Sequence, residues 1–238
     1  MEKFLKIPYN VFNDWDLLQQ FLERRGNPRY ELVGNIDLYD RQDIFGLGNL
    51  VRVHGDLNLR LSSIEFLGNL VQVYGNLDLS HSSIRSLGNL EYVGDELNLY
   101  NSSIQSLGNL EYVGGDFGLR RTSIKSLDNL KYVGRNLSLD QTPLESLGSL
   151  EYVGNYLYLH KTSIKSLDNL QYVGGFLDLR ETPIKSLGNL KKVGDYLDLT
   201  ETKIQSLGNL ESVGTVIYLN KDHQIPEEQL TRFKTRYI

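Results

Sequence analysis

The sequence lacks several features that identify common protein classes. It contains no cysteine among its 238 residues, which excludes disulfide bonds and thiolate metal sites. No stretch approaches the roughly 20 apolar residues of a membrane-spanning helix, and the start, MEKFLKIPYNVFNDW, has no apolar run of signal-peptide length. The formal net charge is −5 and the basic residues are scattered, which argues against a surface for nucleic acid or for a membrane. We therefore expect a soluble cytoplasmic protein.

Motifs of catalysis and of cofactor binding are missing as well. The sequence has no Walker loop, no dinucleotide-binding turn and no recognisable pairing of a nucleophile with a base. The histidines occupy distant or non-equivalent positions of the repeat described below, which argues against a metal cluster. They are His54, His81, His160 and His223. These absences predict that the protein is not an enzyme and has no cofactor or metal.

What the sequence does contain is a 20-residue repeat, which occurs eight times between residues 50 and 209 without an insertion or a deletion. The copy at residues 90–109 reads LEYVGDELNLYNSSIQSLGN. With Leu50 as position one, apolar residues occupy positions one, four, eight, ten, fifteen and eighteen of every copy. A fixed short period of this kind is typical of a solenoid, in which each coil buries its apolar side against its neighbours.

Each position of the repeat predicts a local structure. Positions eight to ten alternate inward and outward, as in Leu157-Tyr158-Leu159, and predict one short strand per coil. Glycine at position five and glycine or aspartate at position nineteen predict tight turns. Serine or threonine at position thirteen and asparagine at position twenty predict polar ladders that bond turn backbone groups. Tyrosines at position three predict a stacked ladder, with a second contact surface as the alternative: Tyr92, Tyr112, Tyr132, Tyr152 and Tyr172.

The run LDLRETPIKSL at residues 177–187 resembles the L-x-L-x-x-N-x-L segment of leucine-rich repeats. It has threonine where that family usually has asparagine. The valine at position four of the repeat, here Val173, lies four residues, rather than three, before the strand leucine. With these departures the repeat looks closer to the L domains of growth-factor receptors, and bacterial, bacteriophage and other viral proteins carry similar repeats. The resemblance covers residues 31–220 and implies a mainly β fold, a right-handed parallel β-solenoid of about ten coils. The shared residues are structural, so the resemblance leaves the function open.

The residues before the regular copies predict an N-terminal cap within one structural domain. Residues 1–30 are expected to form a capping helix with Asn13 as its N-cap and with Phe12 and Leu17 as a hydrophobic staple. A separate partner-binding helix is the alternative. The predicted buried stripe of this helix consists of Trp15, Leu18 and Leu22. Residues 31–49 are a degenerate first coil, so the solenoid is predicted to cover residues 31–220.

The residues after the solenoid predict a second cap. Residues 221–238 are expected to form a C-terminal capping helix, because Glu227 and Glu228 suit the positive end of a helix dipole. The predicted apolar face of this helix consists of Leu230, Phe233 and Tyr237.

The outward strand positions seven, nine and eleven vary, whereas the apolar frame does not, so we expect a binding site among them. Before residue 150 positions seven and nine carry mainly acids and amides, and after it they gather aromatic rings. Clustered surface aromatics indicate a recognition site, although aromatics also suit exposed strands for structural reasons. The rings of the predicted partner-binding site are Tyr156, Tyr158, Phe176, Tyr196 and Tyr218.

Three charged residues complete the predicted site. Asp178 and Asp198 should stand one coil apart, at about 4.8 Å, with Arg180 beside them. A close carboxylate pair is compatible with a cation site or a general acid/base pair. Like charges that are solvated, or neutralised by a lysine or arginine of a partner, are the preferred interpretation.

Three classes of function are compatible with these features. The preferred one is a non-catalytic scaffold whose outward strand face recognises a protein partner, such as a bacterial or viral modulator of a host protein. A carbohydrate-binding or carbohydrate-cleaving β-helix is the alternative, although the eight copies lack the loop insertions that build a cleft. An ice-binding solenoid is the third, although one hydroxyl column beside a turn is not the paired array that such a surface needs.

Overall fold

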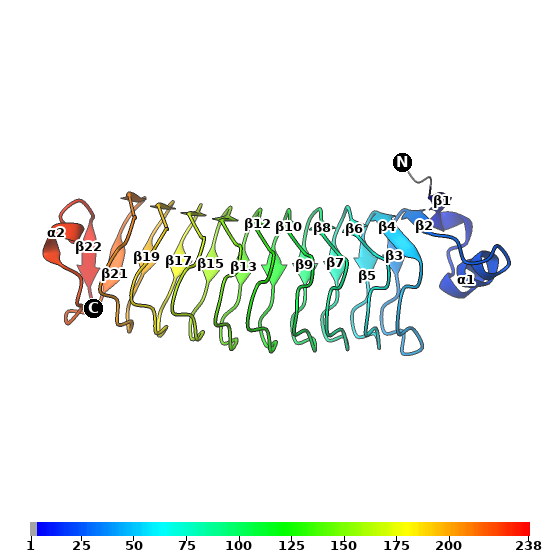
Figure 1. Cartoon of the computed structure of the whole chain (residues 1–238), viewed down its shortest axis with the longest axis horizontal. Coiled ribbons are helices and arrows are strands. Elements are labelled where there is room, and N and C mark those ends of the chain that lie inside the picture. Colours follow the sequence, from blue (N-terminus) through cyan, green and yellow to red (C-terminus); the bar gives the residue numbers. More distant parts are fainter. Residues whose placement is uncertain (1–3) are drawn as a thin grey trace.

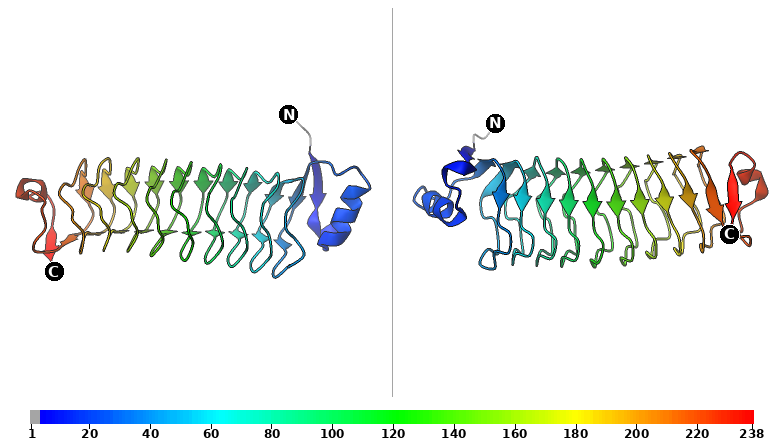
Figure 2. Two further views of the ribbon diagram at one scale, coloured as in Figure 1. Left: turned by 60° about the horizontal axis from the view of Figure 1, so that its bottom comes forward. Right: turned by 180° about the vertical axis from the view of Figure 1, so that it is seen from behind.

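The protein is a straight rod of stacked coils, with its two ends at opposite ends of the rod (Figure 1). The computed structural model describes residues 4–238. Each coil contributes one strand to each of two 11-stranded sheets, and neighbouring strands are parallel. The views from other sides show the same straight stack, with helix α1 (Trp15–Glu23) at one end and helix α2 (Glu227–Leu230) at the other (Figure 2). The expected parallel β-solenoid of about ten coils is confirmed.

The strands of the first sheet include position three of each regular coil. They are β1 (Leu5–Pro8), β2 (Tyr30–Val33), β4 (Leu50–His54), β6 (Gln72–Val73), β8 (Tyr92–Val93), β10 (Tyr112–Val113), β12 (Tyr132–Val133), β14 (Tyr152–Val153), β16 (Tyr172–Val173), β18 (Lys192–Val193) and β20 (Ser212–Val213). The prediction of one strand per coil missed this sheet, because most of its strands have two residues and show no alternation along the sequence.

The strands of the second sheet lie at positions eight and nine, as the sequence predicts. They are β3 (Ile36–Asp37), β5 (Leu57–Asn58), β7 (Leu77–Asp78), β9 (Leu97–Asn98), β11 (Phe117–Gly118), β13 (Leu137–Ser138), β15 (Leu157–Tyr158), β17 (Leu177–Asp178), β19 (Leu197–Asp198), β21 (Ile217–Leu219) and β22 (Thr235–Tyr237). The register pairs equivalent residues, for example Leu157 with Leu177 and Tyr158 with Asp178. Each outward column of the sequence is therefore a physical column on the rod.

The core lies between the two sheets and follows the apolar frame of the repeat. All six predicted positions are buried in all eight regular coils; Leu137 and Leu139, for instance, have no exposed surface. Buried residues of the two caps belong to the same hydrophobic cluster, including Trp15 and Leu230. One continuous core therefore runs the length of the rod and fixes which side chains face outward.

Positions nineteen and five of the repeat differ in what their backbone requires. Position nineteen has a left-handed backbone in every regular coil, as at Asp128 and Gly148, which confirms the predicted turn. The glycines at position five do not have this conformation. A Cβ at Gly154 would instead overlap the carbonyl oxygen of Gly134 in the preceding coil. Six of the eight regular coils therefore carry glycine at position five because neighbouring backbones approach closely, and the prediction that a turn requires it there was wrong.

The predicted polar ladders are confirmed. At position thirteen the hydroxyl donates to the carbonyl oxygen three residues earlier in every regular coil, as from Thr162 Oγ1 to Leu159 at 2.8 Å. At position twenty, Asn169 Nδ2 donates to the carbonyl oxygen of Gly148 at 3.1 Å. The position-thirteen hydroxyls are mostly buried and already engaged, so they do not offer the hydroxyl array on which the ice-binding alternative depends.

The N-terminal cap combines a strand with a helix. Strand β1 extends the first sheet, a 3-10 turn follows at Tyr9–Val11, and α1 buries the predicted stripe. The predicted N-cap was wrong: Asp14 Oδ1 accepts hydrogen bonds from the amides of Asp16 and Leu17. The predicted staple was also wrong, because Leu17 is 53% exposed and Phe12 packs on Phe21, with ring centroids 5.0 Å apart.

The C-terminal cap likewise combines a helix with a strand. Helix α2 has only four residues, and β22 then extends the second sheet by pairing with β21. The predicted helix face was therefore wrong beyond Leu230: Phe233 packs against the core after the helix ends, and Tyr237 belongs to β22. Neither helix in the described part of the chain, residues 4–238, is long and apolar enough to cross a membrane.

Candidate functional site

The five predicted rings form one contiguous cluster on the outer face of the second sheet. Along column seven, the ring centroids of Tyr156 and Phe176 are 4.9 Å apart, and those of Phe176 and Tyr196 are 4.7 Å apart. Tyr158 stands perpendicular to Phe176, with centroids 4.9 Å apart. Tyr218 meets Tyr196 edge-on at 5.7 Å. We call these five residues the aromatic cluster.

The rings of the aromatic cluster are half-buried rather than fully exposed, because they cover one another. Phe176 and Tyr196 are nearly parallel, at 8°, and turn faces toward each other. These two faces are not open to a sugar ring, which weakens the carbohydrate alternative. Mutual stacking also restricts the rings to few rotamers, so a partner that binds them would lose little further side-chain entropy.

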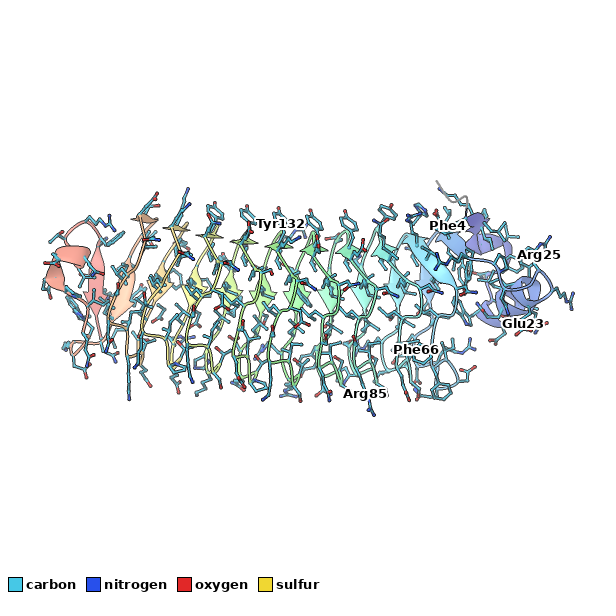
Figure 3. The ribbon with its side chains drawn as sticks, in the orientation of Figure 1. Phe4, Glu23, Arg25, Phe66, Arg85 and Tyr132 are labelled. Carbon is cyan, nitrogen blue, oxygen red and sulfur yellow. The ribbon has the colours of Figure 1, made fainter. Side chains whose placement is uncertain are left out.

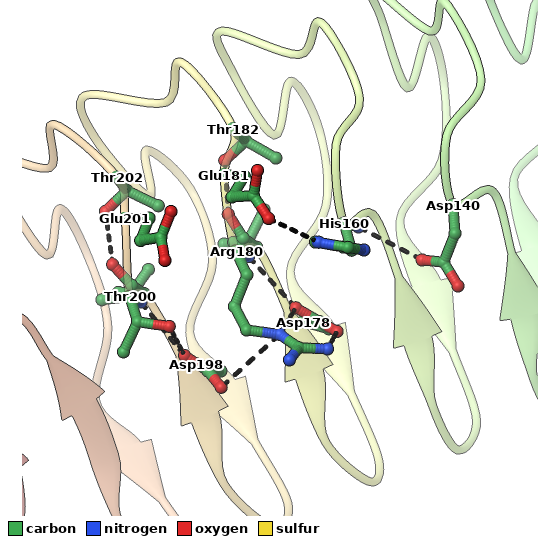
Figure 4. A network of polar contacts seen from close by, with 12 residues as sticks. Asp140, His160, Asp178, Arg180, Glu181, Thr182, Asp198, Thr200, Glu201 and Thr202 are labelled. Atoms are coloured by element: carbon green, nitrogen blue, oxygen red, sulfur yellow. Dashed lines mark hydrogen bonds and ion pairs between the residues drawn. The ribbon is translucent and has the colours of Figure 1, made fainter. Parts of the chain in front are cut away.

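The polar part of the site is an ion-paired group on the same coils (Figure 4). Arg180 Nη2 lies 2.6 Å from Asp178 Oδ2, and its Nε donates to Asp178 Oδ1 at 2.9 Å. Asp198 Oδ2 lies 3.7 Å from Arg180 Nε. The two carboxylates were expected to be solvated or to be neutralised by a partner. The structure corrects this expectation, because Arg180 of the same chain pairs with both of them.

Burial distinguishes the two carboxylates. Asp178 is only 3% exposed, although it occupies an outward column, because Arg180 and the neighbouring rings enclose it. The hydrogen bonds of Asp178 raise the pKa of the Arg180 guanidinium above its ordinary value, so the guanidinium stays charged. Asp198 is less enclosed and accepts bonds from the amide and the hydroxyl of Thr200 at 3.0 and 2.8 Å.

A further acid, Asp140, joins this group from two coils earlier in column eleven. Asp140 Oδ1 accepts a hydrogen bond from the amide of His160 at 3.2 Å. Burial, followed by the charge of Asp178, raises the pKa of the Asp140 carboxyl. At the rim, Glu181 Oε1 lies 3.0 Å from His160 Nε2 and 3.1 Å from Lys161 Nζ. Sequence reasoning did not include Asp140 in the site, because an aspartate among outward residues gives no sign of its neighbours two coils away.

Rings and charges together line a hollow of about 250 Å³. Its lining consists of Asp140, Tyr158, Phe176, Asp178, Arg180, Tyr196 and Asp198. Six of the eight predicted site residues belong to it, and the other two, Tyr156 and Tyr218, contact its rings from outside the lining. Burial and the surrounding carboxylates raise the pKa of the Tyr158 and Tyr196 phenols, as a region of negative potential should.

The amino-terminal half of the same face is built differently. At column seven, Asp56 Oδ1 accepts a hydrogen bond from the amide of Asn76 at 2.8 Å, and Asn76 Oδ1 accepts one from the amide of Glu96 at 3.0 Å. The last such bond runs from the amide of Tyr156 to Asn136 Oδ1, at 3.1 Å. Most column-seven side chains before residue 150 therefore accept a hydrogen bond from the backbone of the next coil, whereas the rings after residue 150 contact one another.

The predicted tyrosine ladder lies on the first sheet. Successive rings from Tyr92 to Tyr172 stack with centroids 4.8–4.9 Å apart and planes within 7° of parallel. The stack continues at its ends to Tyr74 and Lys192. Figure 3 labels Tyr132 in this row along one edge of the rod. The structural interpretation of the ladder is confirmed, and a contact role for its exposed edge stays a prediction.

Neither metal binding nor similarity to known proteins indicates what this site does. Among residues 4–238, no group of three or more histidine, aspartate or glutamate side chains is placed to hold a metal ion. Comparison with protein-family models, with curated proteins and with solved structures gives no match to this chain. The inference of function therefore rests on the geometry of the aromatic cluster and of the hollow.

Proposed function

We propose that this protein is a non-catalytic scaffold of the leucine-rich-repeat type, which binds a protein partner through the aromatic cluster and the adjoining hollow. The observation that supports the proposal is the change of column seven near residue 150. A polar side chain in this column can cap an amide of the next coil, as Asn136 does for Tyr156. Phe176 has no acceptor with which to do so. An aromatic ring thus gives up a contact that helps the fold, which favours a role outside the fold.

The energetics of recognition agree with this interpretation. Binding energy at protein interfaces is concentrated in a few aromatic and arginine side chains surrounded by a polar rim. Here five rings and Arg180 lie together, and Lys161, Glu181 and Glu201 are exposed beside them. The rod is straight, so a partner would meet an elongated and nearly flat surface (Figure 2). An extended segment or another flat face suits such a surface best.

The proposal is tested by capturing partners from the source cell with the full chain and then measuring the affinity of the captured protein. The double variant Tyr158→Ser/Phe176→Ser should weaken binding by about 2 kcal/mol or more, roughly thirtyfold. Both rings are half-buried, so we also expect a loss of stability of about 1–2 kcal/mol, a few degrees in melting temperature.

The matched control is Asn58→Ser/Asn98→Ser, on the same sheet face in the amino-terminal half. This control should bind as the parent chain does. If the control loses affinity and the aromatic variant keeps it, the binding surface lies outside the aromatic cluster and the proposal is wrong.

A further inference from the structure

The lining of the hollow contains more negative than positive side chains. Three carboxylates line it, and Arg180 is its one basic lining residue among the described residues 4–238. Both oxygens of Asp178 are occupied, since Oδ1 accepts from the Arg180 amide and Nε and Oδ2 pairs with Nη2. Lys161 and His160 are engaged with Glu181 at the rim. Asp140 feels the charge of Arg120 but makes no ion pair within residues 4–238, and Asp198 has only the 3.7 Å contact with Arg180. Both carboxylates can therefore take a closer cationic partner from outside the chain.

These two carboxylates still have acceptor capacity. Within residues 4–238, Asp140 receives one hydrogen bond, at Oδ1. Asp198 accepts its two bonds from Thr200 at Oδ1, and its Oδ2 has only the distant Arg180 Nε, at 3.7 Å. A carboxylate can accept about four hydrogen bonds, so each side chain can receive a further donor without losing a present one.

The aromatic side of the hollow favours an organic cation. Tyr158 and Phe176 stand at 90° to each other and form a corner beside Asp178, with Tyr196 on the next coil. Cations are attracted to aromatic rings as well as to carboxylates. A metal ion would require several oxygen ligands converging on one point, whereas Asp140 and Asp198 lie three coils apart, which is about 14 Å along the rod.

We propose that the hollow binds lysine or arginine side chains from an extended basic segment of the partner protein, which lies along the axis of the rod. This inference rests on the proposed function and specifies the chemistry of the partner. A separation of about 14 Å corresponds to roughly four residues of extended chain. Two basic side chains four residues apart would therefore reach Asp140 and Asp198 together, and the stem of one of them would pass over the rings.

The experiment uses the full chain and a nonapeptide of glycine and serine that carries two lysines four positions apart. We expect this peptide to bind at least about tenfold more tightly than the same peptide with glutamine in place of lysine, at about 0.15 M salt. A third peptide, with its lysines two positions apart, should bind more weakly than the first. Isothermal titration calorimetry, or the change in tyrosine fluorescence, measures the three affinities.

Matched variants distinguish binding at the hollow from long-range electrostatic attraction to the whole protein. Asp140→Asn/Asp198→Asn should abolish most of the preference for lysine over glutamine. Asp56→Asn/Asp78→Asn removes the same charge from the same face in the amino-terminal half and should change the affinity less than about twofold. Equal losses of affinity in the two variants would show that net charge alone accounts for the binding, which would overturn the inference.

Two further outcomes would also overturn it. Equal affinity for the lysine and glutamine peptides would exclude cation recognition, and the proposed function would still stand if the Tyr158→Ser/Phe176→Ser variant lost its captured partner. Spermidine supplies the same chemistry from a free polyamine. If spermidine bound more tightly than the lysine peptide and also depended on Asp140 and Asp198, the ligand would be a small molecule and the partner segment would be excluded.

Discussion

The two halves of the outer face share one backbone and differ in what their side chains do. Before residue 150, column seven is a ladder in which Asp56, Asn76 and Asn136 each accept a hydrogen bond from an amide of the next coil. After it, the same column carries Tyr156, Phe176 and Tyr196, which contact one another. The frame beneath is unchanged, because positions eight and ten are buried in every regular coil of both halves.

The two halves differ in which neighbours their outward side chains contact. Most column-seven side chains in the amino-terminal half bond the coil next to them, so a structural role accounts for them. The carboxyl-terminal half departs from the repeat in chemistry but not in geometry, because its rings contact one another instead of accepting an amide of the next coil. In a molecule where packing sets six positions of every coil, a local break in an outward column is therefore the best indicator of function.

The largest expected effect tests whether the two halves share one frame. Leu79→Ala and Leu159→Ala, at position ten of the two halves, should each cost about 2–5 kcal/mol of unfolding free energy, because both side chains are fully buried. We expect the two costs to agree within about 1 kcal/mol. Glu145→Ala, at an exposed pair with Lys125, should cost less than about 0.5 kcal/mol. Urea denaturation provides the measurement, and a much smaller cost for Leu159→Ala would mean that the second half is packed differently.

An intermediate effect on stability is expected from the ion pair between Arg180 and Asp178, which only the carboxyl-terminal half contains. Arg180→Leu leaves the carboxylate of Asp178 enclosed without its main partner and should cost about 1–3 kcal/mol. The matched change in the amino-terminal half is Arg60→Leu, at the same column. Arg60 is exposed, so this change should stay within about 0.5 kcal/mol. Equal melting temperatures for the two variants would show that the buried ion pair contributes nothing.

The smallest expected effect is a loss of folding stability at alkaline pH that arises from the tyrosines of the aromatic cluster. Burial and nearby carboxylates raise the pKa of Tyr158 and Tyr196 above the ordinary value of 10.0. The unfolded chain therefore loses these protons first as pH rises, so their contribution is complete below about pH 10 and is lost above it.

Denaturation midpoints measured between about pH 9 and pH 11 test this effect. The double variant Tyr158→Phe/Tyr196→Phe should show a smaller alkaline loss than the parent chain. Tyr39→Phe, at a half-exposed ring near the amino-terminal end, is the control and should not reduce the loss. If all three proteins lose stability equally, the phenols of the aromatic cluster do not titrate in this range.

The sequence predicts the buried apolar positions of each coil well, because the same pattern recurs in every coil. Position eight, for example, is an apolar strand residue in every regular coil, and one residue out of register would place it in solvent. The first sheet could not be predicted, since its two-residue strands, such as Tyr132–Val133, show no periodicity. The C-terminal cap was mispredicted for a related reason. The spacing of Leu230, Phe233 and Tyr237 fits a helix, but pairing with β21 extends the last residues.

The candidate site could be predicted in part. Its rings and charged residues were identified because equivalent residues stack in register, so neighbours in a column are neighbours in space. The burial of Asp178 could not be predicted, because it depends on how Arg180 folds back over its own strand. The participation of Asp140 likewise depends on side chains that reach across two coils. Register is a property of the repeat, whereas these contacts are properties of individual rotamers.

The glycines at position five have a mechanical consequence. At Gly154 the backbones of adjacent coils are already so close that a single methyl group would overlap the coil before it. Position nineteen is also close at Gly148, where a Cβ would overlap the carbonyl oxygen of Asp128 in the preceding coil. Coils that already touch at both positions leave little room for the rod to shorten on either side, so it should resist bending. A partner that bends the rod must therefore separate coils on the outer side of the bend, which breaks hydrogen bonds between their parallel strands.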